Sequence, residues 1–191
     1  MKSISRTALA LGIFLLGGSS FAQDAPFGSP EEVTYANQLW QALAEARMVG
    51  PNAIGTTTYE GGTGLHTERL ITVQGMVTVN GAEGFAIVKK NFIAGDQAAT
   101  EEQVLEDPLK YLMVITVMYQ RESGYDPDNK DWFWAAFRPD GSVNVNPMGM
   151  TMAGRIVGGG MMPDAPFNCI ACHQAAPGDD YVFLHDSVPA R

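Results

Sequence analysis

Cysteine and histidine are scarce in this sequence, which has two cysteines and three histidines among its 191 residues. The two cysteines, Cys169 and Cys172, lie only three positions apart. A structural zinc site usually has four ligands. A zinc ion bound at these cysteines would therefore need the distant His66 and His185 to converge on them.

Positive charge is also in short supply. Twelve lysines and arginines stand against 21 aspartates and glutamates, which gives a formal net charge of −9 at pH 7. Such an acidic chain is repelled by nucleic-acid phosphates and by anionic membrane surfaces. The charge balance therefore argues against both as partners, and it is compatible with a basic redox partner or a small ligand.

Long apolar runs are absent apart from "TALALGIFLLGG", residues 7–18, which is too short to span a bilayer. The run follows Lys2 and Arg6 and precedes the small residues of "SSFAQD". This order is typical of a secretory signal peptide, with cleavage after Ala22. We expect residues 1–22 to be removed and residues 23–191 to reach the periplasm without a transmembrane anchor.

Internal repeats are absent too, and the length of residues 23–191 suits one domain. A helix is predicted within residues 29–51, because Ser29 and Glu32 have the spacing of a capping box. Strands are predicted from β-branched, turn-bounded segments at 69–81, 84–93, 106–120 and 131–145. Residues 56–64 read as a linker and residues 146–163 as irregular wrapping. The fold class expected is mainly β (α+β), with an N-terminal helix.

Both cysteines belong to the segment Cys169-Ile170-Ala171-Cys172-His173. This is the C-x-x-C-H attachment signature of a c-type haem, in which the two thiols bind the porphyrin and the histidine binds the iron. A redox C-x-x-C, which prefers a βαβ context, and a plain disulfide in an exported chain are alternatives. For an exported protein the motif favours one covalently bound c-type haem on Cys169 and Cys172, with His173 as the iron ligand.

No methionine follows His173. Small helical electron carriers have the motif near the start of the chain and take an axial methionine downstream of it. Methionines between Met148 and Met162 could supply a sixth ligand, although methionine more often fills gaps beside a flat cofactor. Residues 65–145 also lack the amphipathic periods of a four-helix bundle. We therefore expect a five-coordinate or water-bound iron in a β-rich body.

Three blocks resemble the cytochrome P-460 family, whose relatives include the β-sheet cytochromes c′-beta: "GFAIVKKNFI", "ITVMYQRESGYDPDNKDWFWAAFRPDGSV" and "CIACHQAAPGDDYVF". The resemblance covers roughly residues 30–186. It implies an antiparallel β-sheet domain with a C-terminal haem-attachment segment and an iron open on its distal side. The namesake enzymes oxidise hydroxylamine, and one of their lysines is bonded to the porphyrin edge. Lys89 matches that lysine, but Lys90 stands where the family usually has glutamate.

Lys89 is thus the candidate catalytic and haem-binding lysine. In an alternating strand it shares a face with Ile87, while Lys90 shares the other face with Val88. One of the two lysines must therefore point toward the apolar side. A strand lysine ordinarily extends its stem so that the amine reaches water. A buried lysine with a lowered pKa is instead nucleophilic and could react with a haem.

Other polar residues are weaker candidates. His66 could donate to a distal ligand or a propionate, although a turn histidine is more often solvated. Arg69 and Arg155 could pair with propionates. Asp180 and Tyr181 could brace the proximal side.

The function expected from the sequence is to bind or oxidise hydroxylamine or nitric oxide and to pass electrons to a soluble partner. The alternative is a non-catalytic cytochrome that binds nitric oxide or transfers electrons. A homodimer is compatible with either.

Overall fold

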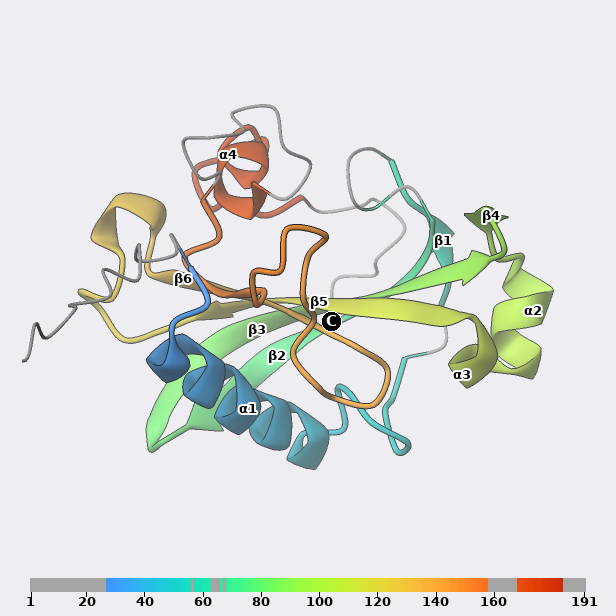
Figure 1. The fold of residues 1–191 in the computed structure, drawn as a ribbon, viewed down its shortest axis with the longest axis horizontal. Helices are drawn as coiled ribbons and strands as arrows, with labels where there is room; N and C mark the ends of the chain where they lie inside the picture. Colours follow the sequence, from blue (N-terminus) through green and yellow to red (C-terminus); the bar gives the residue numbers. More distant parts are fainter. Residues whose placement is uncertain (1–26, 56, 63–65, 67, 158–167, 184–191) are drawn as a thin grey trace, which may run out of the picture.

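The computed structural model describes residues 27–55, 57–62, 66, 68–157 and 168–183. Its centre is a seven-stranded antiparallel sheet with the order β1-β2-β3-β5-β6-β7, and β4 pairs with β3 (Figure 1). The strands are β1 (Tyr59–Glu60), β2 (Arg69–Val79), β3 (Ala82–Ala94), β4 (Gln97–Ala98), β5 (Leu112–Gln120), β6 (Trp132–Phe137) and β7 (Ala153–Gly154). The helices are α1 (Pro30–Glu45), α2 (Glu101–Glu106), α3 (Pro108–Tyr111), the 3₁₀ turn η1 (Pro127–Asn129) and α4 (Cys169–His173). The mainly β, antiparallel architecture with an N-terminal helix is confirmed.

Helix α1 forms as the sequence predicts. The Ser29 hydroxyl accepts a hydrogen bond from the Glu32 amide at 3.2 Å, and the Glu32 carboxylate accepts one from the Ser29 amide at 3.0 Å. This capping box satisfies amides that the first helical turn leaves unpaired. The helix ends at Glu45, earlier than Gly50, because Arg47 takes a left-handed conformation with φ 58°.

Strand alternation gives the sheet two different faces. Val88, Val117 and Ala135 lie opposite one another on β3, β5 and β6, and they pack beneath α1. The neighbouring row, Ile87, Met118 and Trp134, faces the side that carries α4 (Figure 1). Lys89 belongs to this second face, since it lies two residues from Ile87 on β3.

Several boundaries differ from the sequence prediction. Strand β5 coincides with the apolar run inside 106–120, and the residues before it form α3, where the Asp107 carboxylate accepts from the Lys110 amide. The predicted linker contains the short strand β1, and the predicted irregular segment contains β7. Residues 1–22 and 158–163 lie outside the described residues, so the signal peptide stays a prediction. Within the described ranges, no helix is long and apolar enough to cross a bilayer.

Candidate functional site

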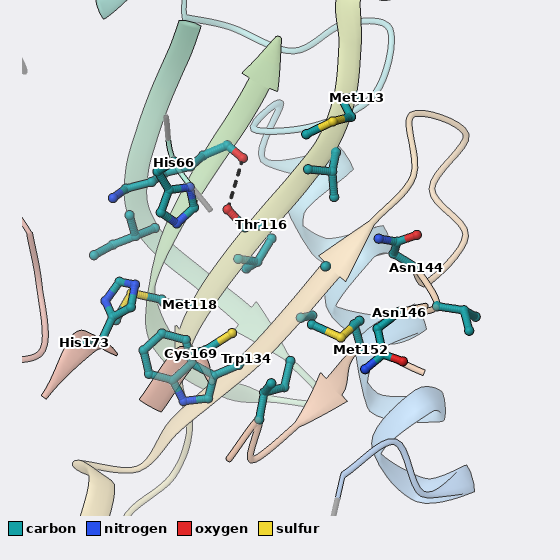
Figure 2. Close-up of a pocket in the computed structure, with 18 of the residues that line it drawn as sticks. His66, Met113, Thr116, Met118, Trp134, Asn144, Asn146, Met152, Cys169 and His173 are labelled. Atoms are coloured by element: carbon teal, nitrogen blue, oxygen red, sulfur yellow. Dashed lines mark hydrogen bonds between the residues drawn. The ribbon is translucent and has the colours of Figure 1, made fainter. Parts of the chain in front are cut away.

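A cavity of about 400 Å³ lies on the α4 side of the sheet (Figure 2). Its floor is the apolar row of Ile87, Met118 and Trp134, contributed by three adjacent strands. His66 and His173 lie at one end of it, and Asn144 and Asn146 lie toward the other (Figure 2). The cavity therefore joins residues that are more than 100 positions apart in the sequence.

His173 is buried at the end of α4, with 7% of its surface exposed. Its Nδ1 lies 2.7 Å from the carbonyl oxygen of Tyr181. Because a carbonyl can only accept, Nδ1 carries the hydrogen and Nε2 keeps a free lone pair. Burial lowers the pKa of His173 to about 4. At neutral pH the ring is therefore in the neutral form that binds metals.

The loop after α4 holds that carbonyl in place. Trp132 Nε1 donates to the Asp180 carbonyl at 3.0 Å, and the Asp180 carboxylate accepts from the Val182 amide at the same distance. Tyr181 adopts φ 67°, which turns its carbonyl back toward His173. Asp180 and Tyr181 do brace the histidine, but the contact is made by a backbone atom that any residue type could have supplied.

The two cysteines are free thiols on one short helix, capped by Asn168 Oδ1, which accepts from the Ala171 amide at 3.0 Å. Cys169 lines the cavity, and burial raises the pKa of its thiol to about 12, while Cys172 is exposed. The antiparallel sheet gives these cysteines no βαβ setting, so the redox alternative loses its context. Among the described residues, no cluster of three or more metal-ligating His, Cys, Asp or Glu side chains occurs.

Lys89 lines the same cavity and is only 7% exposed. Burial lowers the pKa of its amine, and the neighbouring Cys172 partly opposes this change. The described part of the chain offers this amine no hydrogen bond or ion pair. Lys90 points to the opposite face, where its Nζ donates to the Ile54 carbonyl at 3.1 Å. The burial of Lys89 in the cavity does not fit the alternative in which its stem carries the amine out to water, and its candidate role toward a haem stays a prediction.

His66 is the second histidine of the cavity. Its Nδ1 lies 3.0 Å from Asn91 Oδ1, and the Asn91 amide nitrogen donates to the carbonyls of Lys89 and Val114, both at 3.1 Å. Those two bonds fix the orientation of the amide, so Oδ1 is the acceptor and His66 Nδ1 is the donor. Burial, followed by the nearby Lys89 charge, lowers the pKa of His66 to about 4. A solvated turn histidine is therefore the wrong description.

Three buried polar atoms on the cavity wall have no hydrogen-bond partner within the described ranges: Trp134 Nε1, Asn146 Nδ2 and Glu68 Oε2. The Asn146 side chain is oriented by its own loop, since Oδ1 accepts from the amides of Met148 and Met150 at 3.0 and 2.9 Å. Its Nδ2 is thereby left as an unpaired donor. Glu68 and Asn146 could not be identified from the sequence, because nothing there distinguishes them from ordinary loop residues, and Trp134 was expected only to pack the core or the face of a haem.

The two candidate arginines are engaged elsewhere. Arg69 bonds to Glu60 at 3.1 Å and to the Ala99 carbonyl at 3.3 Å. Arg155 donates to the Tyr125 carbonyl at 2.7 Å. Neither arginine lines the cavity, so their proposed pairing with propionates gains no support.

Of the candidate methionines, Met152 lines the cavity and Met148 is exposed. Met161 and Met162 lie outside the described residues, as does His185. Met152 is thus the one member of the Met148–Met162 group, as far as the structure describes it, that reaches the cavity.

The family model of cytochrome P460 matches residues 72–184, which is more than half of the chain. The match includes β3, β5, β6 and α4, and hence the floor of the cavity and the C-x-x-C-H segment. The comparisons with curated proteins and with solved structures gave no match. The resemblance carried by the three sequence blocks is thereby confirmed. The chain therefore belongs to the cytochrome P460 family, and with it to the haem proteins.

Proposed function

We propose that the protein is a c-type cytochrome that holds one haem in this cavity, bound covalently through Cys169 and Cys172, with His173 as the iron ligand. The observation that carries the proposal is the state of His173. Its ring is buried, neutral and anchored through Nδ1, and its free Nε2 belongs to the same cavity that Cys169 lines. A hydrogen bond from the other ring nitrogen is the usual way in which a metal-binding histidine is oriented.

The other residues of the cavity fit a haem. The floor of Ile87, Met118 and Trp134 is apolar and suits the face of a porphyrin. The unpaired N–H groups of Trp134 and Asn146 need acceptors, since a buried donor without a partner costs roughly 1–3 kcal/mol. Haem propionates are acceptors of the required kind.

We further propose that this site binds or oxidises hydroxylamine or nitric oxide and passes electrons to a soluble partner. A haem held by Cys169, Cys172 and His173 would supply a redox-active iron that can bind such a ligand. Ile87, Met118 and Trp134 make the cavity wall apolar, and the Tyr181 carbonyl holds His173 in one tautomer. The amine of Lys89, when neutral, can accept a proton from hydroxylamine. Removal of residues 1–22 and export to the periplasm are part of the same proposal.

A second candidate is electron transfer or nitric oxide binding without turnover. The apolar floor of the cavity favours nitric oxide binding, because that molecule is small and uncharged and needs no proton acceptor.

The attachment is tested on protein produced with export and haem maturation. Acid–acetone extraction should leave the haem on the chain, and the intact mass should exceed that of the processed chain by one haem. Cys169→Ala and Cys172→Ala should each leave a single thioether and lower the yield of haem-loaded protein, whereas Ala171→Ser, between them, should not. Haem that extracts cleanly from the wild-type protein would end the proposal.

The ligand chemistry is tested on the same preparation. Nitric oxide should change the spectrum of the ferrous protein, and hydroxylamine that of the ferric protein. Reduction of an added electron acceptor in the presence of hydroxylamine distinguishes turnover from binding alone. A protein that responds to neither compound would contradict the proposed ligand chemistry.

A further inference from the structure

We propose that His66 determines the ligand specificity of the cavity: its Nε2 accepts a hydrogen bond from the N–H or O–H of hydroxylamine, and this contact favours hydroxylamine over nitric oxide. Nitric oxide has no hydrogen to donate. The inference rests on the proposed function, because it requires a haem held at His173 and a small nitrogen ligand beside it. It reverses the donor role that the sequence suggested for His66.

The first support is the orientation of the ring. His66 Nδ1 donates to Asn91 Oδ1 at 3.0 Å, and Asn91 Nδ2 donates to the carbonyls of Lys89 and Val114, both at 3.1 Å. Asn91 is fully buried, so its amide cannot turn over without losing both bonds and placing its oxygen against two carbonyl oxygens. A neutral imidazole with its hydrogen on Nδ1 has only a lone pair on Nε2. His66 is therefore fixed as an acceptor.

The second support is the place of this ring in the cavity. His66 lines the cavity, and its ring and that of His173 lie at the same end, with their centroids 6.4 Å apart (Figure 2). A small ligand of an iron held by His173 therefore binds at the end of the cavity that His66 borders. Among the described residues, Nε2 of His66 has no hydrogen-bond partner. The contact that we infer is made to the ligand and not to the iron.

The other unpaired groups of the cavity wall show why an acceptor discriminates between the two compounds. Trp134 Nε1 and Asn146 Nδ2 are donors, and a donor can bond to the oxygen of hydroxylamine or of nitric oxide. An acceptor bonds only to a compound that carries hydrogen. Glu68 Oε2 is another unpaired acceptor on the wall, so the test compares His66 with Glu68.

The test is ligand binding to the haem-loaded protein without an electron acceptor, at a mildly alkaline pH where a histidine of ordinary pKa is also neutral. His66→Leu should raise the dissociation constant of hydroxylamine for the ferric protein about tenfold, the effect of one lost hydrogen bond. It should leave the dissociation constant of nitric oxide for the ferrous protein unchanged. His66→Gln, whose side-chain oxygen can also accept, should keep most of the affinity for hydroxylamine. Met148→Leu, at an exposed position outside the cavity, is the control and should keep both constants.

A second measurement distinguishes an acceptor from a donor. The N–O stretching frequency of the ferrous nitric oxide complex responds to hydrogen bonds that the protein donates to the ligand. Because Nε2 of His66 has no hydrogen to donate, this frequency should be the same in the wild-type protein and in His66→Leu.

Four results would overturn the inference: an unchanged hydroxylamine affinity in His66→Leu, an equal loss of affinity for both ligands, no recovery in His66→Gln, or a shifted N–O frequency in His66→Leu. A loss of hydroxylamine affinity in Glu68→Gln and not in His66→Leu would assign the acceptor to Glu68 instead. The proposed function fails separately, through haem that extracts from the chain or through a haem spectrum that neither compound changes.

Discussion

Lys89 and Lys90 are adjacent in the sequence and meet opposite environments. Lys90 lies on the α1 face and gives its amine to the Ile54 carbonyl. Lys89 lies on the cavity face, between Thr72 of β2 and Thr116 of β5 in the strand register, and burial lowers the pKa of its amine. A neutral amine is a nucleophile, whereas an ammonium ion is not. Burial lowers the pKa of both amines, and the two lysines differ in their contacts: Lys90 donates to a backbone carbonyl, whereas Lys89 lines the cavity.

We predict that Lys89 is bonded to the porphyrin edge in the mature protein. Forming this bond removes two hydrogen atoms, one from the amine and one from a ring carbon, so it requires a two-electron oxidant such as peroxide. Peptide mapping should recover the Lys89 segment joined to the "CIACH" peptide through the haem. Lys89→Ala should restore ordinary c-haem absorption and abolish hydroxylamine oxidation, whereas Lys90→Arg should keep the wild-type spectrum. Recovery of the Lys89 peptide free in full yield from haem-loaded protein would refute the bond.

At the scale of elements, the sequence predicted what is local. The capping box of α1 and the alternation of Ile87 and Lys89 on β3 need only short-range patterns. Strand β6 is different: all six residues from Trp132 to Phe137 are buried, so no polar alternation reveals its two faces. That Trp134 lies opposite Met118 follows from the register of β5 and β6, which the sequence does not fix.

The remaining parts of the site depend on contacts that no motif records. His66 is anchored by Asn91 across 25 positions, and His173 is anchored by the backbone of Tyr181 rather than by a side chain. The C-x-x-C-H segment could therefore be found in the sequence. The carbonyl that orients His173 and the asparagine that orients His66 could not. The contact of His66 forms only when the segment before β2 reaches Asn91 on β3, and that of His173 spans eight positions within α4 and the loop after it.

The start of α1 gives a prediction at this scale. The Glu32 carboxylate accepts from the amides of Gly28 and Ser29 at 2.7 and 3.0 Å, and from that of Arg155, far along the chain, at 3.4 Å. Ser29→Ala should lower the free energy of unfolding by about 1 kcal/mol. Glu32→Ala should lower it by more, on the order of 2 kcal/mol, because several amides lose their acceptor at once. Urea unfolding measures both.

Glu31→Gln is the matched control for the α1 variants, since Glu31 is exposed in the same helical turn. It should change the free energy of unfolding by less than about 0.5 kcal/mol. If Glu32→Ala were no more costly than this control, the contact between the helix start and Arg155 would contribute nothing to stability.

The sheet separates a filled hydrophobic core on its α1 side from the cavity on its α4 side. Beneath α1, a continuous core joins Tyr35, Leu39 and Leu43 to β3, β5 and β6. On the α4 side the corresponding space is the cavity, with its unpaired Trp134 and Asn146 donors. Apolar side chains fill the first side, whereas the second side encloses the cavity.

We therefore expect the two sides to respond differently when haem is withheld. Residues 23–191 produced without export should carry no haem, and their thermal midpoint should fall below that of the haem-loaded protein, because apolar walls and unpaired donors then face water. Amide hydrogen exchange should become faster in residues 168–183, which hold α4 and the Tyr181 loop, while α1 stays protected by its own core.

The control is haem-loaded protein that has been treated with a reductant, and it should exchange like the untreated haem-loaded protein. Equal exchange of residues 168–183 with and without haem would show that the cofactor does not complete this side. Simultaneous loss of protection in α1 would show that the two sides of the sheet fold as one unit.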